Sequence, residues 1–281
     1  MAELRWETEL GSIHVHGWQR PLMESALTEG LALAREGRRV GAFTEFVGQD
    51  VYLKAGPLAG SARLRHGLAW HLLRRRWPRV REYENLSWLI ERHFQTVLPL
   101  AAGVLLRRGL PHFQFLATAR IPGARDLEAV LPECSAELRA GLWEELAREL
   151  ARMHALHFVH HDLYLRNLLL LPRAAPRRLA FLDAWAGGPE LGLRGPEYDL
   201  ACFFLDASEA LTEQEQLSFL ERYRRERILQ QAPLRAGWLE RTASLRAGLR
   251  RRLVREPQRL RGCEPPRASW PSHELRSDLG L

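Results

Sequence analysis

Residues 160–167 read HHDLYLRN and place an aspartate and an asparagine five positions apart, Asp162 and Asn167. A loop carboxylate can orient an attacking hydroxyl group and accept its proton. An amide oxygen held nearby can face a Mg²⁺ ion on nucleotide phosphates. The pair therefore predicts phosphoryl transfer, with Asp162 as the catalytic carboxylate and Asn167 as a metal ligand.

The spacing H-x-D-x-x-x-x-N is typical of protein-kinase catalytic loops. Asp183 follows Asp162 by 21 positions and directly follows the stretch Arg178–Leu182. Kinases place a second metal-binding aspartate at a strand end at a similar separation. Asp183 is therefore the second candidate metal ligand, and a hairpin of Leu168–Leu171 with Arg178–Leu182 is expected to position it.

Every basic residue except Lys54 is arginine. The lone lysine is either an accident of an arginine-biased composition or a position that requires an ammonium group, since the two cations differ in shape and donor geometry. It ends VYLK, residues 51–54, which resembles the kinase strand whose lysine contacts the α/β-phosphates. A helix over Arg79–Phe94 should supply its carboxylate partner. Glu82 is the first choice and Glu84 the alternative, and a solvated helix face is the other interpretation of both.

Residues Ala26–Lys54 are predicted to form a small antiparallel sheet with a turn at Glu36–Gly41. Gly37 and Gly41 could let backbone N–H groups approach nucleotide phosphates. The pattern is not a full G-x-G-x-x-G, so two ordinary hairpin glycines are an equal interpretation.

The composition bounds the class of protein. A chain of 281 residues with 46% hydrophobic content can fill a sizeable core in one large domain or two lobes. A net charge of +7 favours an anionic partner such as nucleic acid, an acidic membrane surface or a phosphorylated glycolipid. Three widely spaced cysteines favour a reducing compartment, and no stretch resembles a signal peptide or a membrane span.

Further helices are expected to complete the chain. Ser61–Arg76 reads as a basic amphipathic helix, Ser135 should cap a long helix over Ala136–Leu156, and Asp199 should tie down the loop before Asn167. A last helix over Leu234–Leu260 has a basic face, which is either solvated or a membrane contact. The expected organisation is an N-lobe over residues 1–118, a C-lobe over 119–261 and a disordered tail over 262–281.

Taken together, these segments resemble the bacterial lipopolysaccharide kinases, which include the Kdo and core-heptose kinases and are a branch of the protein-kinase-like fold. The resemblance runs over Gly37–Leu205. It rests on VYLK, REYENL, IPGARDL, ARMHALHFVHHDLYLRNLLL, AFLDAW and YDLACF. His161 stands where that family often has glycine, and Ala184-Trp185 replaces the Phe-Gly of protein kinases.

This resemblance implies an α+β, two-lobed protein-kinase-like fold with a small antiparallel-sheet N-lobe and a mainly helical C-lobe. It implies ATP and Mg²⁺ as cofactors and a sugar hydroxyl of the lipopolysaccharide inner core as acceptor. It also implies that the active site contains Lys54, Glu82, Asp162, Asn167 and Asp183.

The alternatives are a small-molecule or protein kinase of the same fold, or a non-catalytic anion-binding pseudokinase. The expected partners are a glycolipid or sugar acceptor and an anionic membrane surface contacted through the arginine-rich helices, with no nucleic acid. The expected location is the cytoplasm, including the inner face of the inner membrane. The sequence leaves the oligomeric state open.

Overall fold

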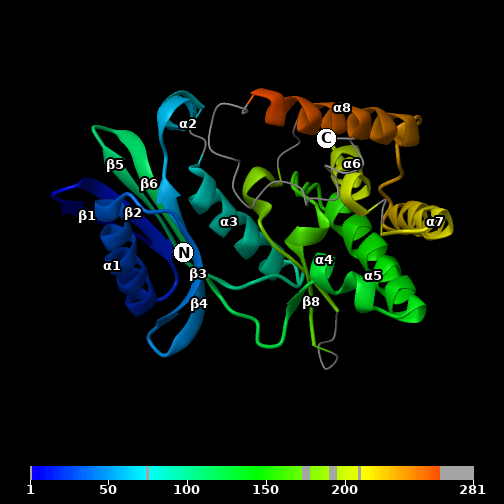
Figure 1. The fold of residues 1–281 in the computed structure, drawn as a ribbon, viewed down its shortest axis with the longest axis horizontal. Coiled ribbons are helices and arrows are strands. Elements are labelled where there is room, and N and C mark those ends of the chain that lie inside the picture. Colours follow the sequence, from blue (N-terminus) through cyan, green and yellow to red (C-terminus); the bar gives the residue numbers. More distant parts are fainter. Residues whose placement is uncertain (1, 74–75, 173–177, 190–194, 208–209, 260–281) are drawn as a thin grey trace. The chain divides into compact units, whose positions relative to one another are not determined.

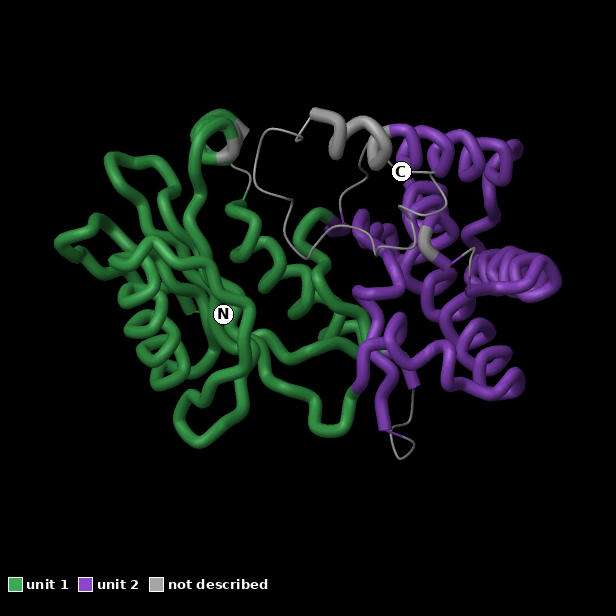
Figure 2. The backbone as a smooth tube through the Cα atoms, in the orientation of Figure 1, with its two compact units in different colours: residues 1–124, 180–186 green, residues 125–179, 187–281 purple. Residues whose placement is uncertain are grey.

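The computed structural model describes residues 2–73, 76–172, 178–189, 195–207 and 210–259. The chain divides into two compact units, shown in different colours in Figure 2. Unit 1 contains residues 1–124 and 180–186, and unit 2 contains residues 125–179 and 187–281. This division differs from the predicted one, because residues 180–186 were expected in the C-lobe and belong to unit 1. The predicted tail, residues 262–281, lies outside the described residues.

Unit 1 is built on an antiparallel six-stranded sheet with the strand order β1-β2-β5-β6-β4-β3. Its strands are β1 (Ala2–Thr8), β2 (Gly11–Gly17), β3 (Val40–Phe46), β4 (Gln49–Pro57), β5 (Pro99–Arg107) and β6 (Leu110–Ala119). Two hairpins turn at Val47-Gly48 and Arg108-Gly109, where both residues have positive φ. Two-residue turns of this kind match the twist of paired strands.

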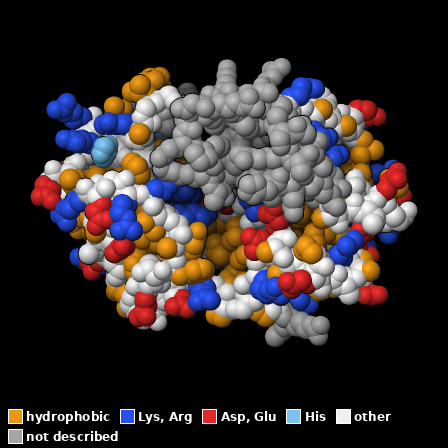
Figure 3. All heavy atoms as spheres, in the orientation of Figure 1, with side chains coloured by type: hydrophobic (Ala, Val, Ile, Leu, Met, Phe, Trp, Pro, Cys, Tyr) orange, Lys and Arg blue, Asp and Glu red, His pale blue; other side chains and the backbone are white. Residues whose placement is uncertain are grey.

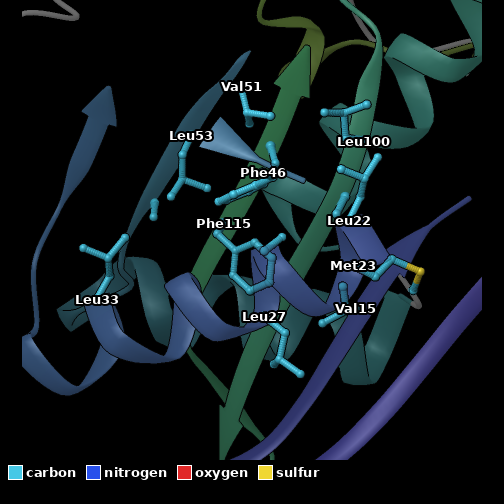
Figure 4. Packing of buried hydrophobic residues seen from close by; sticks show 14 of the residues in the cluster. Val15, Leu22, Met23, Leu27, Leu33, Phe46, Val51, Leu53, Leu100 and Phe115 are labelled. Atoms are coloured by element: carbon cyan, nitrogen blue, oxygen red, sulfur yellow. The ribbon is translucent and has the colours of Figure 1, made fainter. Parts of the chain in front are cut away.

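Helix α1 (Arg20–Glu36) corrects the prediction of a sheet over Ala26–Lys54. Its buried residues recur with helical spacing, and Gly37 ends the helix in a left-handed conformation. The strands begin only at Val40. Figure 4 shows α1 packing its leucines and Met23 against Phe115 and other side chains of the sheet. This cluster is the hydrophobic core of unit 1.

The opposite face of the sheet carries the polar residues of interest. Leu53 and Ala55 belong to the core cluster, so the alternation along β4 directs Lys54 to the other face. Helices α2 (Gly60–Leu73) and α3 (Pro78–Glu91) follow β4 along the chain, and α3 contacts β5 and β6.

Unit 2 is mainly helical. Its elements are β7 (Arg125–Asp126), α4 (Leu127–Val130), α5 (Ala136–Ala155), β8 (Leu168–Leu170), α6 (Pro196–Ala207), α7 (Glu213–Leu229) and α8 (Trp238–Arg259). The prediction that Ser135 caps the long helix α5 is confirmed, since its hydroxyl oxygen accepts from the Leu138 N–H. The chain passes from unit 2 into unit 1 within β9 (Leu179–Phe181), which leads directly to Asp183.

Candidate active site

Lys54 lies at the centre of an ion-paired cluster in unit 1. Its Nζ is 3.0 Å from Glu82 Oε1 and 3.0 Å from Asp183 Oδ1. Burial by itself disfavours the ammonium form, but the two carboxylates hold the pKa of Lys54 above its ordinary value. Strand β4, helix α3 and the end of β9 therefore bring together three of the residues that the sequence singled out.

Of the two candidate glutamates, Glu82 is the one that contacts Lys54. The Glu82 side chain is 1% exposed, and each of its carboxylate oxygens has a cationic partner. Glu84 instead pairs with Arg76 at 3.1 Å. Because the Glu82 side chain is buried and contacts Lys54 of β4, it is not part of a solvated face of α3.

The second cation on Glu82 is Arg79, which sequence reasoning missed. Its Nη1 donates to Glu82 Oε2 and lies 3.7 Å from Asp183 Oδ1. The backbone N–H of Arg79 donates to the Gln114 side-chain oxygen at 3.2 Å, which fixes the first turn of α3 to strand β6. The i, i+3 spacing of Arg79 and Glu82 on a helix was the available signal.

Asp183 is held in place by its backbone and by its charge. Its φ of 59° is in the left-handed region, which only glycine, asparagine and aspartate adopt with any ease. The adjacent Ala184 carbonyl accepts from Asn85 Nδ2 at 2.6 Å. Burial alone would raise the pKa of the Asp183 carboxyl, but Lys54 and Arg79 hold it below its usual range. Asp183 is therefore an ionised carboxylate at the end of a strand.

The two candidate glycines have different positions. Gly37 ends α1, and its N–H donates to the Ala34 carbonyl oxygen, so it is not a hairpin glycine and its N–H is already used. Gly41 lies in edge strand β3 opposite Lys54. A Cβ at Gly41 would come within 3.0 Å of the Tyr52 hydroxyl oxygen, which is a packing reason for glycine there.

The loop with Asp162 and Asn167 belongs to unit 2 and is internally braced. Asn167 Nδ2 donates to the Asp162 backbone carbonyl at 2.7 Å, which leaves the amide oxygen of Asn167 able to accept a cation. Arg166 Nη2 lies 3.6 Å from Asp162 Oδ1, and its guanidinium also lies over the Tyr164 ring. The carboxylate therefore has a cation beside it on the same loop.

Asp199 of α6 confirms the prediction that it ties down the loop. Its two carboxylate oxygens accept from the backbone N–H groups of His160 at 2.6 Å and His161 at 2.7 Å. His154 Nε2 lies 3.1 Å from the same carboxylate, and its Nδ1 lies 2.7 Å from the Tyr223 hydroxyl oxygen, so His154 is a hydrogen-bonded packing residue. Burial would raise the pKa of Asp199, but these hydrogen bonds, led by that of His154, lower it.

Two backbone features explain residue choices around this loop. His161 has a φ of 62°, which favours glycine, and glycine is the residue expected there from the family pattern. A Cβ on Gly187 would lie 2.3 Å from the Val159 carbonyl oxygen. The Gly187-Gly188 pair can therefore approach the loop closely, and Gly188 exchanges two backbone hydrogen bonds with Val159.

Each unit contributes one oxygen donor of a kind that suits Mg²⁺, Asp183 in unit 1 and Asn167 in unit 2. An ionised aspartate and a free amide oxygen are the ligands that this hard cation accepts, and Mg²⁺ usually needs only one or two carboxylates besides phosphate and water. In the part of the chain that the structure describes, no group of three or more His, Cys, Asp or Glu side chains is arranged to hold a metal by itself.

A model of the lipopolysaccharide kinase (Kdo/WaaP) family matches residues 30–223. The chain belongs to this family. The matched region begins within α1 and ends within α7, so it includes every candidate site residue. This finding confirms the family resemblance of the sequence.

Two curated kinases from Vibrio species are similar to the chain. A 3-deoxy-D-manno-octulosonic acid kinase of Vibrio parahaemolyticus is 31% identical over 142 residues, which is 50% of each chain. The enzyme of the same name from Vibrio cholerae is 30% identical over 97 residues, 34% of this chain and 40% of that protein. The chain thus matches half or less of the length of these relatives.

The solved structure of WaaP in complex with acyl carrier protein is similar with a TM-score of 0.51 and 23% identity. The similarity covers 76% of this chain and 86% of that one. At this identity the likeness shows the fold alone, and it confirms the expected protein-kinase-like α+β class. Among the described residues, no helix of the kinase-family chain is both long enough and apolar enough to cross a membrane.

Proposed function

We propose that the protein is an ATP-dependent kinase that phosphorylates a sugar hydroxyl of the lipopolysaccharide inner core, on Kdo or heptose. The observation that carries the proposal is the cluster of Lys54, Glu82 and Asp183, built on the strand, helix and strand end where a kinase needs them. Family membership and the named activity of the Vibrio relatives support the choice of acceptor.

Lys54 would contact the α/β-phosphates while Glu82 fixes its direction. Asn167 and Asp183 would hold Mg²⁺, which when bound supplies charge neutralisation on the phosphate oxygens. Asp162, which has Arg166 beside it, would orient the acceptor hydroxyl and accept its proton. Most of the catalytic effect then comes from positioning and electrostatics.

Binding of ATP with Mg²⁺ tests the nucleotide part of this proposal. Thermal unfolding of the full chain should shift upward with Mg²⁺ and ATP together, since a ligand of the native state stabilises it. Label from γ-labelled ATP should then appear on Kdo-bearing lipid A. Nucleotide binding with label only on another acceptor would indicate a small-molecule or protein kinase. Failure to bind nucleotide would indicate an anion-binding protein without catalysis.

We also propose that the kinase works on the inner face of the inner membrane and contacts it through α2. Leu64, Leu68 and Leu72 recur every four residues on one side of α2 and are 56%, 56% and 75% exposed. Figure 3 shows hydrophobic side chains gathered over the end of this helix. The sequence from Val51 to Arg81 contains no Asp or Glu, so the leucines lie in a cationic segment. An apolar ridge with basic flanks suits an anionic bilayer.

Co-sedimentation with vesicles containing anionic lipid tests the α2 contact. The wild-type chain should bind the vesicles at low salt, and each arginine near the membrane surface should contribute roughly 1 kcal/mol to the binding free energy. The chain should dissociate as the salt concentration rises, because salt screens these charges. Leu68→Glu with Leu72→Glu should abolish most binding, whereas Leu229→Ser, on an equally exposed leucine of α7 (68%), should not. Full binding by the double variant would contradict the α2 assignment. It would indicate that the basic face of α8 makes the contact instead. The expected contact of Arg74 and Arg75 lies outside the described residues.

A further inference from the structure

The ion-paired cluster of unit 1 contains two cations and two carboxylates. Lys54 and Arg79 both contact Glu82, and both face the same oxygen of Asp183, at 3.0 and 3.7 Å. Glu82 is 1% exposed, whereas the side chains of the other three are between 22% and 30% exposed. Glu82 is thus the buried anchor, and the three remaining groups reach the surface of unit 1.

Asp183 occupies the place that an external anion would take. Asp183 Oδ1 faces the two cations that the buried Glu82 carboxylate already holds in place. Asp183 also ends a strand, and its second expected role is that of a metal ligand. If the Asp183 side chain rotates to bind a metal cation, Lys54 and Arg79 each lose one anionic partner. Both cations then keep their contact with Glu82. Phosphate oxygens are the anions that arginine and lysine then accept most readily.

The position of Arg79 supports this role. It lies in the first turn of α3, after Pro78, where the helix dipole favours negative charge. Its backbone is fixed by Gln114, so the guanidinium is presented from a rigid support. Burial alone would lower the pKa of Arg79, but Glu82 and Asp183 raise it.

We propose that Arg79 is a second phosphate-binding cation of the nucleotide site, and that Asp183 fills its phosphate position until the nucleotide enters. The inference rests on the proposed ATP-dependent activity, which does not itself require Arg79. It predicts that the affinity for a nucleotide depends on Arg79 through the phosphates and not through the base or the ribose.

Calorimetric titration with ATP, ADP and adenosine, each with and without Mg²⁺, tests the role of Arg79. Arg79→Met should weaken ATP and ADP at least ~10-fold, the scale of one charge-assisted hydrogen bond, and leave adenosine unchanged. Arg35→Met on α1, which loses the same charge from a 56%-exposed side chain, should leave all three affinities unchanged.

A double-mutant cycle distinguishes phosphate binding by Arg79 from a structural role in which Arg79 only holds Glu82. In a Glu82→Gln background Arg79 no longer holds Glu82 and faces only Asp183, which keeps Lys54 as its cation when Arg79 is removed. The phosphate role predicts that Arg79→Met still weakens ATP ~10-fold in this background. Equal affinities of the Glu82→Gln protein with and without Arg79 would overturn the inference, as would an equal loss of adenosine binding.

The outcome for the wild-type chain separates this inference from the proposed function. A wild type that binds no nucleotide contradicts the proposed function and the inference together. A wild type that binds Mg²⁺ and ATP normally, with Arg79→Lys and Arg79→Met both unaffected, contradicts only the role of Arg79.

Discussion

Replacement of Lys54 by arginine tests whether the cluster needs a compact ammonium group. If Lys54 were one basic residue among many, Lys54→Arg would be the mildest change in this arginine-rich chain. The structure predicts otherwise. Lys54 Nζ bridges two carboxylates at 3.0 Å each, and the remaining Glu82 oxygen is already taken by Arg79.

A guanidinium at position 54 is longer and planar, and it would be pressed against the guanidinium of Arg79. The new side chain must therefore turn away and leave at least one contact. Losing one charge-stabilising contact at a reaction centre costs roughly 2.7–4 kcal/mol, or about 10²–10³ in rate.

The assay is phosphoryl transfer from γ-labelled ATP to Kdo-bearing lipid A, with thermal unfolding measured on the same samples. Lys54→Arg should fold with a near-native melting temperature and transfer at least ~100-fold more slowly. The matched control is Arg38→Lys, the reverse exchange at a 63%-exposed side chain, which should change neither quantity. Near-full activity of Lys54→Arg would refute the role given to the cluster.

Three further predictions concern the titratable side chains of Asp183, His16 and Asp199. Asp183→Asn should weaken binding of ATP with Mg²⁺ but tighten binding of metal-free ATP, because it removes a competing carboxylate from Lys54; equal weakening in calorimetry would make Asp183 a structural residue. Burial lowers the pKa of His16 to about 4, so as the pH falls the imidazole is protonated in the unfolded chain before it is protonated in the folded chain. The free energy of unfolding should therefore be highest above pH ~6.5 and fall by up to about 3 kcal/mol toward pH 4. His16→Gln should reduce this pH dependence in urea titrations, and an identical pH profile would contradict the assignment. Asp199→Asn should lower the free energy of unfolding by roughly 3 kcal/mol, since the loop loses charge-assisted hydrogen bonds in a fully buried site, and an unchanged value would contradict that role.

The loop of residues 160–167 was predictable as a candidate site because its polar residues lie close together in the sequence. His160, Asp162 and Asn167 lie on one short segment, so their spacing alone constrains the arrangement. Asp199 was predictable for a related reason, since an aspartate entering an apolar helix after a turn has few other partners than nearby backbone. The pairing of Lys54 with Glu82 was predicted from the kinase-like strand VYLK and the helix that follows it, with Glu84 as the alternative, because nothing local distinguishes the two glutamates.

The sheet predicted over Ala26–Lys54 failed because the apolar segment Leu31–Arg35 was read without its context. The buried residues of α1 extend from Leu22 to Leu33 with helical spacing, and Gly37 is a common helix stop signal. Arg79 was not predictable as a site residue, because its role depends on α3 meeting the end of β9 in three dimensions. Sequence spacing gives only its proximity to Glu82.

Asp162→Asn gives the most direct test of the central claim, that the chain is a kinase with its catalytic carboxylate on the 160–167 loop. The measurement is transfer of labelled phosphate from ATP to Kdo-bearing lipid A, with the dissociation constant for ATP and Mg²⁺ determined on the same preparations. The account predicts unchanged nucleotide binding and a rate lower by about 100-fold or more, the scale for losing a positioned base. Undiminished transfer by the purified variant would contradict it.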